Sequence, residues 1–295
     1  MTKHNPIIKP FLKWAGGKRQ LLSEIKKYLP RNINDYTYFE PFVGAGAVFF
    51  ALQPKKAVVN DFNSQLILTY NVIKENAEEL IVLLKKYGEK NNKEIFYTIR
   101  NLDRDTAKFN KLTKIEKAAR LIFLNKTCFN GLYRVNSQGL FNVPYGKYKN
   151  PAICEEIVLR QISAYFNSNE IKIMNGDFEQ AVASADKNSF VYFDPPYHSP
   201  GKTNFTGYLA DGFGEEEQER LRNVMLEMTN RGAKCLLSNS DTDYIRDLYN
   251  YQCFDIISVR AKRAINSDSA GRGKVNELLV INRKANQGAN QGENC

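Results

Sequence analysis

The stretch Val191-Tyr192-Phe193-Asp194-Pro195-Pro196-Tyr197 decides the fold. Its apolar and aromatic half predicts a buried strand, and the two prolines stop that strand because they cannot donate ladder hydrogen bonds. A carboxylate and an aromatic ring are therefore expected on a stiff turn at a strand end. Such a turn suits an exocyclic amine on a flat base. Asp194 and the Pro195 carbonyl would accept its hydrogens, and Tyr197 would stack on the ring.

The rest of the chain alternates predicted strands with helices. Besides the strand over residues 190–194, strands are expected over residues 36–40, 57–60, 171–175, 233–238, 254–259 and 275–281. A helix is expected over residues 215–231, and another after Asn76, which we expect to form a capping box with Glu79. This alternation predicts the α/β fold class, with a doubly wound and mostly parallel sheet.

The net charge of +10 is concentrated in two windows. Residues 108–149 carry nine lysines and arginines against one acid, Glu116, with seven aromatic residues between them. Residues 260–274 carry five basic residues against Asp268. A solvated basic face is the simpler interpretation. Basic residues interleaved with rings suit phosphates and stacked bases, so the pattern favours nucleic acid as the partner.

Residues 73–163 contain predicted helices but no buried strand run, although Asn130-Gly131 and residues 137–139 are typical of the turns of a short β-hairpin. We interpret this segment as an insertion domain between two parts of a catalytic domain, residues 1–72 and 164–284. Residues 199–214 are expected to form a mobile lid. Residues 285–295 are low in complexity and are expected to be disordered.

Composition argues against several classes of protein. The chain has 295 residues, 43% of them hydrophobic, which supports a sizeable core. No apolar run approaches the length of about 18 residues that a membrane span needs, and the first residues lack a signal-peptide core, so a cytoplasmic protein is expected. The five cysteines form no Cys-x-x-Cys pair and there are only two histidines. We therefore expect reduced, mostly buried thiols and no metal site.

Four further segments have the composition of ligand-binding loops. Residues 39–46, Phe-Glu-Pro-Phe-Val-Gly-Ala-Gly, allow a tight turn, but they lack the third glycine of a dinucleotide fingerprint. Asp61 and Asp177-Phe178 follow predicted strands, where an acid suits ribose hydroxyls. Residues 11–19 resemble a phosphate loop only superficially, because Arg19 replaces its Ser or Thr. Alone, the glycine turn is weak evidence against an ordinary loop, and for Asp61 alone a helix cap is the better interpretation.

Together, and in this order, the motifs resemble those of DNA adenine-N6 methyltransferases of the Dam type, including modification enzymes of restriction systems that recognise GATC. The resemblance spans residues 10–282. It includes residues 130–136, Asn-Gly-Leu-Tyr-Arg-Val-Asn, followed by residues 141–146, Phe-Asn-Val-Pro-Tyr-Gly. It implies a Rossmann-like, S-adenosylmethionine-dependent methyltransferase fold whose mainly helical insertion is the target-recognition domain.

The resemblance also implies roles for individual residues. The catalytic turn would consist of Asp194, Pro195, Pro196 and Tyr197. S-adenosylmethionine would be bound by Trp14, Ala15, Gly16, Lys18, Phe39, Glu40, Pro41, Phe42, Gly44, Gly46, Asp61, Asp177 and Phe178. Double-stranded DNA containing GATC would be contacted by Lys13, Phe129, Asn130, Leu132, Arg134, Asn136, Pro144 and Arg272. Phe129 matches an aromatic wedge beside the flipped base.

The implied reaction is methylation of adenine N6 in duplex GATC. The target base lies inside the duplex, so it must be flipped out, which costs a few kcal/mol. We expect the enzyme to protect host DNA from a cognate restriction enzyme that shares the site without forming a stable complex. Alternatives are an adenine methyltransferase with another DNA or RNA target, a DNA-binding regulator of the same fold with weak or absent catalysis, and an NAD-dependent enzyme. The last leaves the basic insertion unexplained.

Overall fold

The computed structural model describes residues 8–14, 16, 18–199, 213–262 and 274–283. Seven strands form one sheet in the order β3-β2-β1-β4-β5-β7-β6. Strands β1 to β5 are parallel, and β7 runs antiparallel to β5 and β6. The strands are β1 (Thr37–Glu40), β2 (Lys56–Asp61), β3 (Glu170–Asn175), β4 (Ser189–Phe193), β5 (Lys234–Ser240), β6 (Phe254–Lys262) and β7 (Lys274–Asn282). The predicted α/β class and mostly parallel sheet are confirmed.

Strand β4 lies in the middle of the sheet and is buried on both faces. Phe190 and Tyr192 join one hydrophobic cluster, whereas Val191 and Phe193 join the other, because successive side chains point to opposite faces. Helices α2 (Ala47–Leu52), α3 (Ser64–Glu75) and α8 (Glu156–Asn167) supply the first cluster. Helices α9 (Phe178–Val182), α10 (Glu215–Asn230) and α11 (Asp243–Leu248) supply the second. The helix predicted over residues 215–231 is therefore confirmed as α10.

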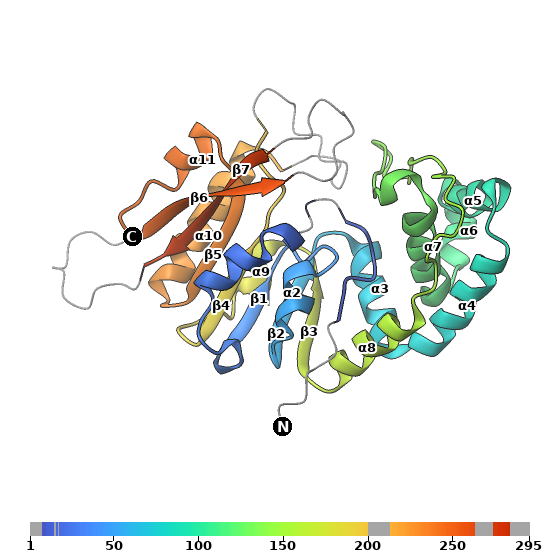
Figure 1. The fold of residues 1–295 in the computed structure, drawn as a ribbon, viewed down its shortest axis with the longest axis horizontal. Helices are drawn as coiled ribbons and strands as arrows, with labels where there is room; N and C mark the ends of the chain where they lie inside the picture. The colour runs from blue at the N-terminus through green and yellow to red at the C-terminus, as the bar shows by residue number, and fades with distance from the viewer. Residues whose placement is uncertain (1–7, 15, 17, 200–212, 263–273, 284–295) are drawn as a thin grey trace.

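The segment between β2 and β3 is helical and lies beside the sheet (Figure 1). It contains α4 (Ala77–Glu89), α5 (Lys93–Arg100), α6 (Thr106–Lys111) and α7 (Lys114–Thr127). The remaining short elements are η1 (Lys18–Gln20), α1 (Leu22–Ile25), η2 (Lys26–Tyr28), η3 (Ile33–Asp35), η4 (Asn101–Arg104) and η5 (Phe129–Gly131). The proposed boundaries near residues 72 and 163 fall inside α3 and α8, and the division into domains stays a prediction.

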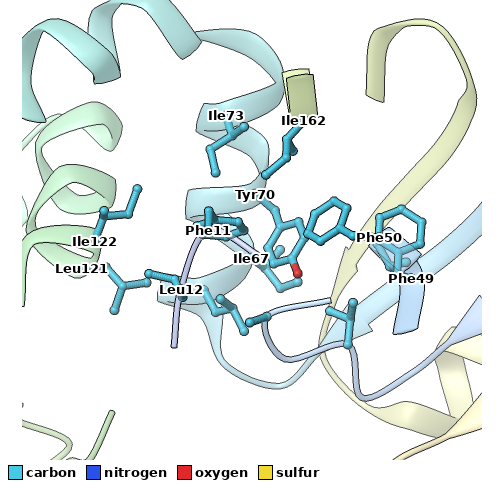
Figure 2. Close-up of a cluster of buried hydrophobic side chains, with 14 of the residues drawn as sticks. Phe11, Leu12, Phe49, Phe50, Ile67, Tyr70, Ile73, Leu121, Ile122 and Ile162 are labelled. Atoms are coloured by element: carbon cyan, nitrogen blue, oxygen red, sulfur yellow. The ribbon is translucent and has the colours of Figure 1, made fainter. Parts of the chain in front are cut away.

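The chain before β1 joins the sheet to this helical segment. Figure 2 shows Phe11 and Leu12 between Tyr70 of α3 and Leu121 of α7. Phe11 and Tyr70 meet edge to face with ring centroids 5.1 Å apart. Residues near the N-terminus, the sheet and α7 therefore share one hydrophobic core.

Two local predictions need correction. Asn76 precedes α4, but its side chain makes no capping hydrogen bond, and its backbone amide, which Glu79 would have to accept in a capping box, donates instead to the Val72 carbonyl at the end of α3. The capping box lies instead at Thr113 and Glu116 of α7. The predicted hairpin is a chain reversal with two isolated antiparallel bridges, Cys128 with Tyr145 and Val135 with Phe141, instead of a regular ladder.

Three of the four described cysteines follow the prediction, and Cys295 lies outside the described residues. Cys128, Cys154 and Cys235 are free thiols, and the first and last are buried. Cys253 is disulfide-bonded, so the expectation of a reduced thiol is wrong at this position. Among the described residues, no helix is both long and apolar enough to cross a bilayer. The described part of the chain also holds no group of three or more His, Cys, Asp or Glu side chains that could bind a metal ion.

The turn from β1 into α2 requires glycine at residue 46. Gly46 has φ +73°, and a Cβ there would lie 2.8 Å from both Phe50 Cε2 and the Tyr70 hydroxyl oxygen. We expect Gly46→Ala to lower the free energy of unfolding by about 1–3 kcal/mol. Gly88 in α4 is the matched control, because a Cβ there meets nothing within 4 Å. Gly88→Ala should stabilise by about 0.5–1 kcal/mol, and equal effects of both variants in urea denaturation would contradict this account.

Candidate active site

The candidate site lies where the parallel strands end and the strand order reverses. Strands β1 and β4 are neighbours, and the chain runs outward from them in both directions. In open α/β sheets such a switch point creates a crevice at the carboxyl ends of the strands. Glu40 ends β1, Asp61 ends β2, and Asp194 follows β4 directly. The sheet therefore brings the three carboxylates to one edge.

Asp194 is held by two donors on a single oxygen. The Lys18 ammonium lies 2.8 Å from Asp194 Oδ1, and the Ser238 hydroxyl donates to the same atom at 2.9 Å. Ser238 Oγ is also 3.0 Å from the hydroxyl of Tyr192. Strand alternation explains the set, because Tyr192 and Asp194 share one face of the sheet and neighbouring β5 presents Ser238 to it. Among the described residues, no donor is bonded to Asp194 Oδ2.

Opposing influences act on the Asp194 carboxyl. Burial raises the pKa of Asp194, and the charge of Glu277 adds to that rise. The Lys18 ammonium and the Ser238 hydroxyl lower the pKa by favouring the ionised form. These two partners therefore oppose protonation of a carboxylate that is only 17% exposed.

Side chains of α10 and β5 hold the turn after Asp194 through hydrogen bonds to its backbone. Gln218, fully buried in α10, donates to the Pro196 carbonyl at 2.9 Å. Asn239 of β5 donates to the Gln218 side-chain oxygen at 2.9 Å and accepts the His198 amide at 3.2 Å. The Pro195 carbonyl, by contrast, has no donor among the described residues. The turn thus presents two acceptors next to one another in sequence, Asp194 Oδ2 and the Pro195 carbonyl.

Tyr197 is also held at two points. Its hydroxyl donates to Glu277 Oε2 at 2.7 Å. The Lys18 ammonium lies 4.5 Å from the centroid of its ring, within the range of a cation–π contact. Burial raises the pKa of Tyr197 well above its usual value, and the nearby charges of Asp194 and Glu277 add to that rise. The phenol therefore stays a donor.

The loops after β1 and β2 form a second part of the site. Asp61 accepts the Gly44 amide at 3.0 Å and the Asn63 amide at 2.9 Å. Burial raises the pKa of Asp61 to about 6, although both amides lower it. Glu40 is 2% exposed and accepts the Tyr38 hydroxyl at 2.5 Å. Burial raises the pKa of Glu40 well above its usual range.

Glycine and a bulky ring meet beside these carboxylates. Gly44 has φ +50°, and a Cβ there would lie 3.0 Å from Trp14 Cδ1. The Trp14 ring in turn stacks on Tyr133, with centroids 5.0 Å apart. Asn60 donates to the carbonyls of Pro41 and Gly176, which ties together the turns after β1 and β3. Asn60 Oδ1 is buried and has no partner among the described residues.

The remaining predicted cofactor residues are distributed around this edge. Phe39 and Phe178 are buried in the second cluster, and the Phe42 ring lies 5.3 Å from that of Phe178. Asp177 caps α9 and accepts Arg220 Nη2 at 2.5 Å. The Arg220 guanidinium lies 4.5 Å from the centroid of the Phe178 ring. In this structure Arg220 therefore contacts both members of the Asp177-Phe178 pair.

Apart from Arg272, which is outside the described residues, the predicted DNA-contacting residues lie on or beside the reversal formed by residues 128–146. Phe129 is 51% exposed, and Arg134 and Pro144 are exposed as well. Arg134 Nε donates to Asn142 Oδ1 at 2.8 Å. Asn136 Oδ1 accepts the amides of Gln138 and Leu140, so this side chain closes the turn.

Lys13 reaches the same reversal from the N-terminal segment. Buried Asn125 of α7 accepts the Lys13 amide at 2.9 Å and donates to the carbonyls of Lys13 and Gly131. The Lys13 ammonium lies 5.0 Å from the centroid of the Tyr148 ring. Asn130 is left-handed with φ 56°, and Leu132 is half-buried. Predicted residues Ala15 and Arg272 lie outside the described residues, as do most of the expected lid and residues 285–295, for which disorder is expected.

Sequence reasoning missed several side chains that hold the site. Ser238 ends the strand expected over residues 233–238 and Asn239 follows it, Gln218 lies in the helix expected over residues 215–231, and Asn125 lies in the expected insertion. Glu277 carried a usable signal, because it is a charge inside the apolar strand Lys274–Asn282. The partners that tie these residues to distant elements lie between 21 and 112 positions away along the chain, so spacing could not reveal them.

Comparison with known proteins agrees with this geometry. The family described as D12 class N6 adenine-specific DNA methyltransferase matches residues 14–265. The type II methyltransferase M1.LlaDCHI of Lactococcus lactis subsp. cremoris is 46% identical over 96% of this chain and 98% of its own. The type II methyltransferase M.MjaIII of Methanocaldococcus jannaschii is 43% identical over 93% and 99%. The DNA adenine methylase of Escherichia coli is 35% identical over 92% and 94%.

The chain belongs to the D12 class of N6 adenine-specific DNA methyltransferases. It is therefore an enzyme that methylates adenine in DNA, and the predicted family is confirmed.

Proposed function

We propose that this enzyme flips the adenine of duplex GATC into the crevice beside β4 and transfers a methyl group to its N6 from S-adenosylmethionine. The observation that carries this proposal is the pair of acceptors Asp194 Oδ2 and the Pro195 carbonyl. No described residue donates to either one, and both belong to the turn that bears Tyr197. An adenine amine has two hydrogens to donate, which matches two acceptors.

In this reaction the turn that contains Asp194 must activate the adenine amine, which is a poor nucleophile. The lone pair of the adenine amine is delocalised into the ring. When Asp194 and the Pro195 carbonyl accept its hydrogens, the nitrogen moves toward tetrahedral geometry and the lone pair becomes available. The Lys18 and Ser238 contacts support this role because they favour an ionised Asp194 that accepts without first losing a proton. Tyr197 stacks on the flipped ring.

The residues of the second part of the site fit a nucleoside-type methyl donor. Gly44 leaves space beside Trp14 that a Cβ would fill, and Asp61 supplies an acid at the end of β2. Phe62, the next residue, is 62% exposed and offers a flat apolar surface. Trp14, Glu40 and Asp61 would hold the donor, together with the turn of residues 41–46. S-adenosylmethionine supplies an electrophilic methyl group on a sulfonium.

We further propose that residues 73–163 recognise the target. Resemblance of residues 130–136 and 141–146 to GATC-specific enzymes supports this choice, and the excess of basic residues suits the phosphate backbone. Exposed Arg134 would pair bidentately with guanine, and exposed Phe129 would fill the space that the flipped base leaves. Two relatives named type II methyltransferases support a role in protecting DNA from a restriction enzyme.

The target sequence and the catalytic turn can be tested together. DNA from cells that express the protein should resist nucleases blocked by adenine methylation in GATC. Asp194→Asn keeps the size of the side chain but replaces the carboxylate, so DNA from cells expressing it should be cut normally. Thermal melting checks that this variant folds. Equal labelling by methyl-labelled S-adenosylmethionine of duplexes with and without GATC would defeat the specificity proposal.

Variants of Arg134 test whether this residue determines the specificity for the target sequence. If it pairs with guanine, Arg134→Ala should lose about 1–3 kcal/mol of discrimination against a substituted G·C pair. Arg134→Lys should not restore it, because Lys lacks the bidentate fork. Lys114 is an exposed basic residue at the start of α7 and serves as the matched control. Lys114→Ala should affect all duplexes alike in competitive methylation assays, and a uniform loss for Arg134→Ala would instead indicate a phosphate contact.

A further inference from the structure

Glu277 occupies an unusual position for a charged residue. It lies in β7, opposite Ser240 of β5, and the next three residues, Leu278, Leu279 and Val280, are fully buried. Because β7 runs antiparallel to β5, this early part of β7 meets the carboxyl edge of the parallel strands. Strand alternation sets Glu277 on the face of Leu279, which belongs to the same cluster as Tyr192. The Glu277 carboxylate thus lies at the same edge of the sheet as the catalytic turn, and on the same face as Tyr192.

The described contacts of Glu277 lead to that turn. It forms no ion pair with any described residue, and its side chain accepts the hydrogen bond that Tyr197 donates at 2.7 Å. A carboxylate in an apolar strand adds desolvation free energy without contributing to the hydrophobic core. Stability of the sheet therefore does not explain why this position carries an acid.

We propose that Glu277 is a positioning residue that fixes the ring of Tyr197 for stacking on the flipped adenine. This inference rests on the proposed function. A tyrosine on a turn can rotate about two side-chain bonds, and each wrong orientation removes the stacking surface. Glu277 restrains the hydroxyl end, while Gln218 restrains the preceding Pro196 carbonyl at 2.9 Å. With both ends held, the ring is oriented before the base arrives, which is the advantage of preorganisation.

The proposal separates the hydroxyl of Tyr197 from its ring. Tyr197→Phe keeps the aromatic ring and removes the hydroxyl donor. Glu277→Ala removes the acceptor and keeps the whole tyrosine side chain, but without its restraint. If the two groups act as one unit, the variants should share one defect and the double variant should be no worse than either. Glu277→Gln retains a side-chain oxygen that can accept the phenol hydrogen, so at a pH on the activity plateau it should restore most of the activity that Glu277→Ala loses.

The experiment measures steady-state methylation and base flipping on a duplex that the wild type methylates, with 2-aminopurine at the target adenine for the flipping assay. We expect Tyr197→Phe and Glu277→Ala each to lower kcat/KM about tenfold to a hundredfold, as loss of a hydrogen bond to a charged group does. Both should reduce the 2-aminopurine signal that reports flipping. Binding of S-adenosylmethionine without DNA, measured by calorimetry, should be unchanged.

Several outcomes would overturn the inference: normal activity of Glu277→Ala or Tyr197→Phe, additive losses in the double variant, or a Glu277→Gln variant as poor as Glu277→Ala. If Glu277→Ala does not fold, Tyr197→Phe and Glu277→Gln carry the test. The activity of Asp194→Asn shows whether the inference about Glu277 fails alone or the proposed function fails as well. An active Asp194→Asn would refute the catalytic turn itself, whereas an inactive Asp194→Asn beside normal Tyr197→Phe would refute only the role of Glu277.

Discussion

Burial of the Asp194 carboxylate is the constraint on which the rest of this structure depends. A carboxylate removed from water strongly favours protonation unless a cation and hydrogen-bond donors compensate it. Here the cation is Lys18, which is 5% exposed, and the donor is Ser238. Each comes from a different part of the chain. The ion pair therefore requires that the N-terminal segment, β4 and β5 meet at one edge of the sheet.

The same N-terminal segment connects the site to the helical insertion. Lys13 lies five residues before Lys18, and both its backbone amide and its carbonyl are hydrogen-bonded to the side chain of Asn125 in α7. Asn125 also donates to the Gly131 carbonyl. Gly131 has φ +63°, and a Cβ there would lie 2.4 Å from Lys13 Cδ and 2.9 Å from Lys13 Cβ, so another residue at this position would strain the backbone and displace the Lys13 side chain. Phe11 and Leu12 anchor this segment in the core between α3 and α7 (Figure 2). The reversal that we propose to contact DNA is thus connected to Lys18, the partner of Asp194, through the segment that contains Lys13.

Local pattern was enough to predict the strands and the loops that follow them. The apolar run at residues 189–193 and the two prolines after it are signals within a few residues, and so are the glycines of residues 39–46. Long-range partners were not predictable in this way. The carboxylate of Asp194 could be named, but its donors Lys18 and Ser238 depend on how strands are ordered. The misplaced capping box has a similar origin, because the Asn76 amide that Glu79 would accept is already bonded to the Val72 carbonyl of α3.

The central claim is that Asp194 acts as an ionised acceptor whose protonation is opposed by its two partners. Its pKa is raised by burial and lowered by Lys18 and Ser238. Single-turnover methylation should therefore rise with pH as Asp194 loses its proton and then reach a plateau. Removing one donor in Ser238→Ala should raise the pKa of Asp194, so the rising limb should move to higher pH. A limb that stays in place or moves to lower pH in Ser238→Ala would contradict this account.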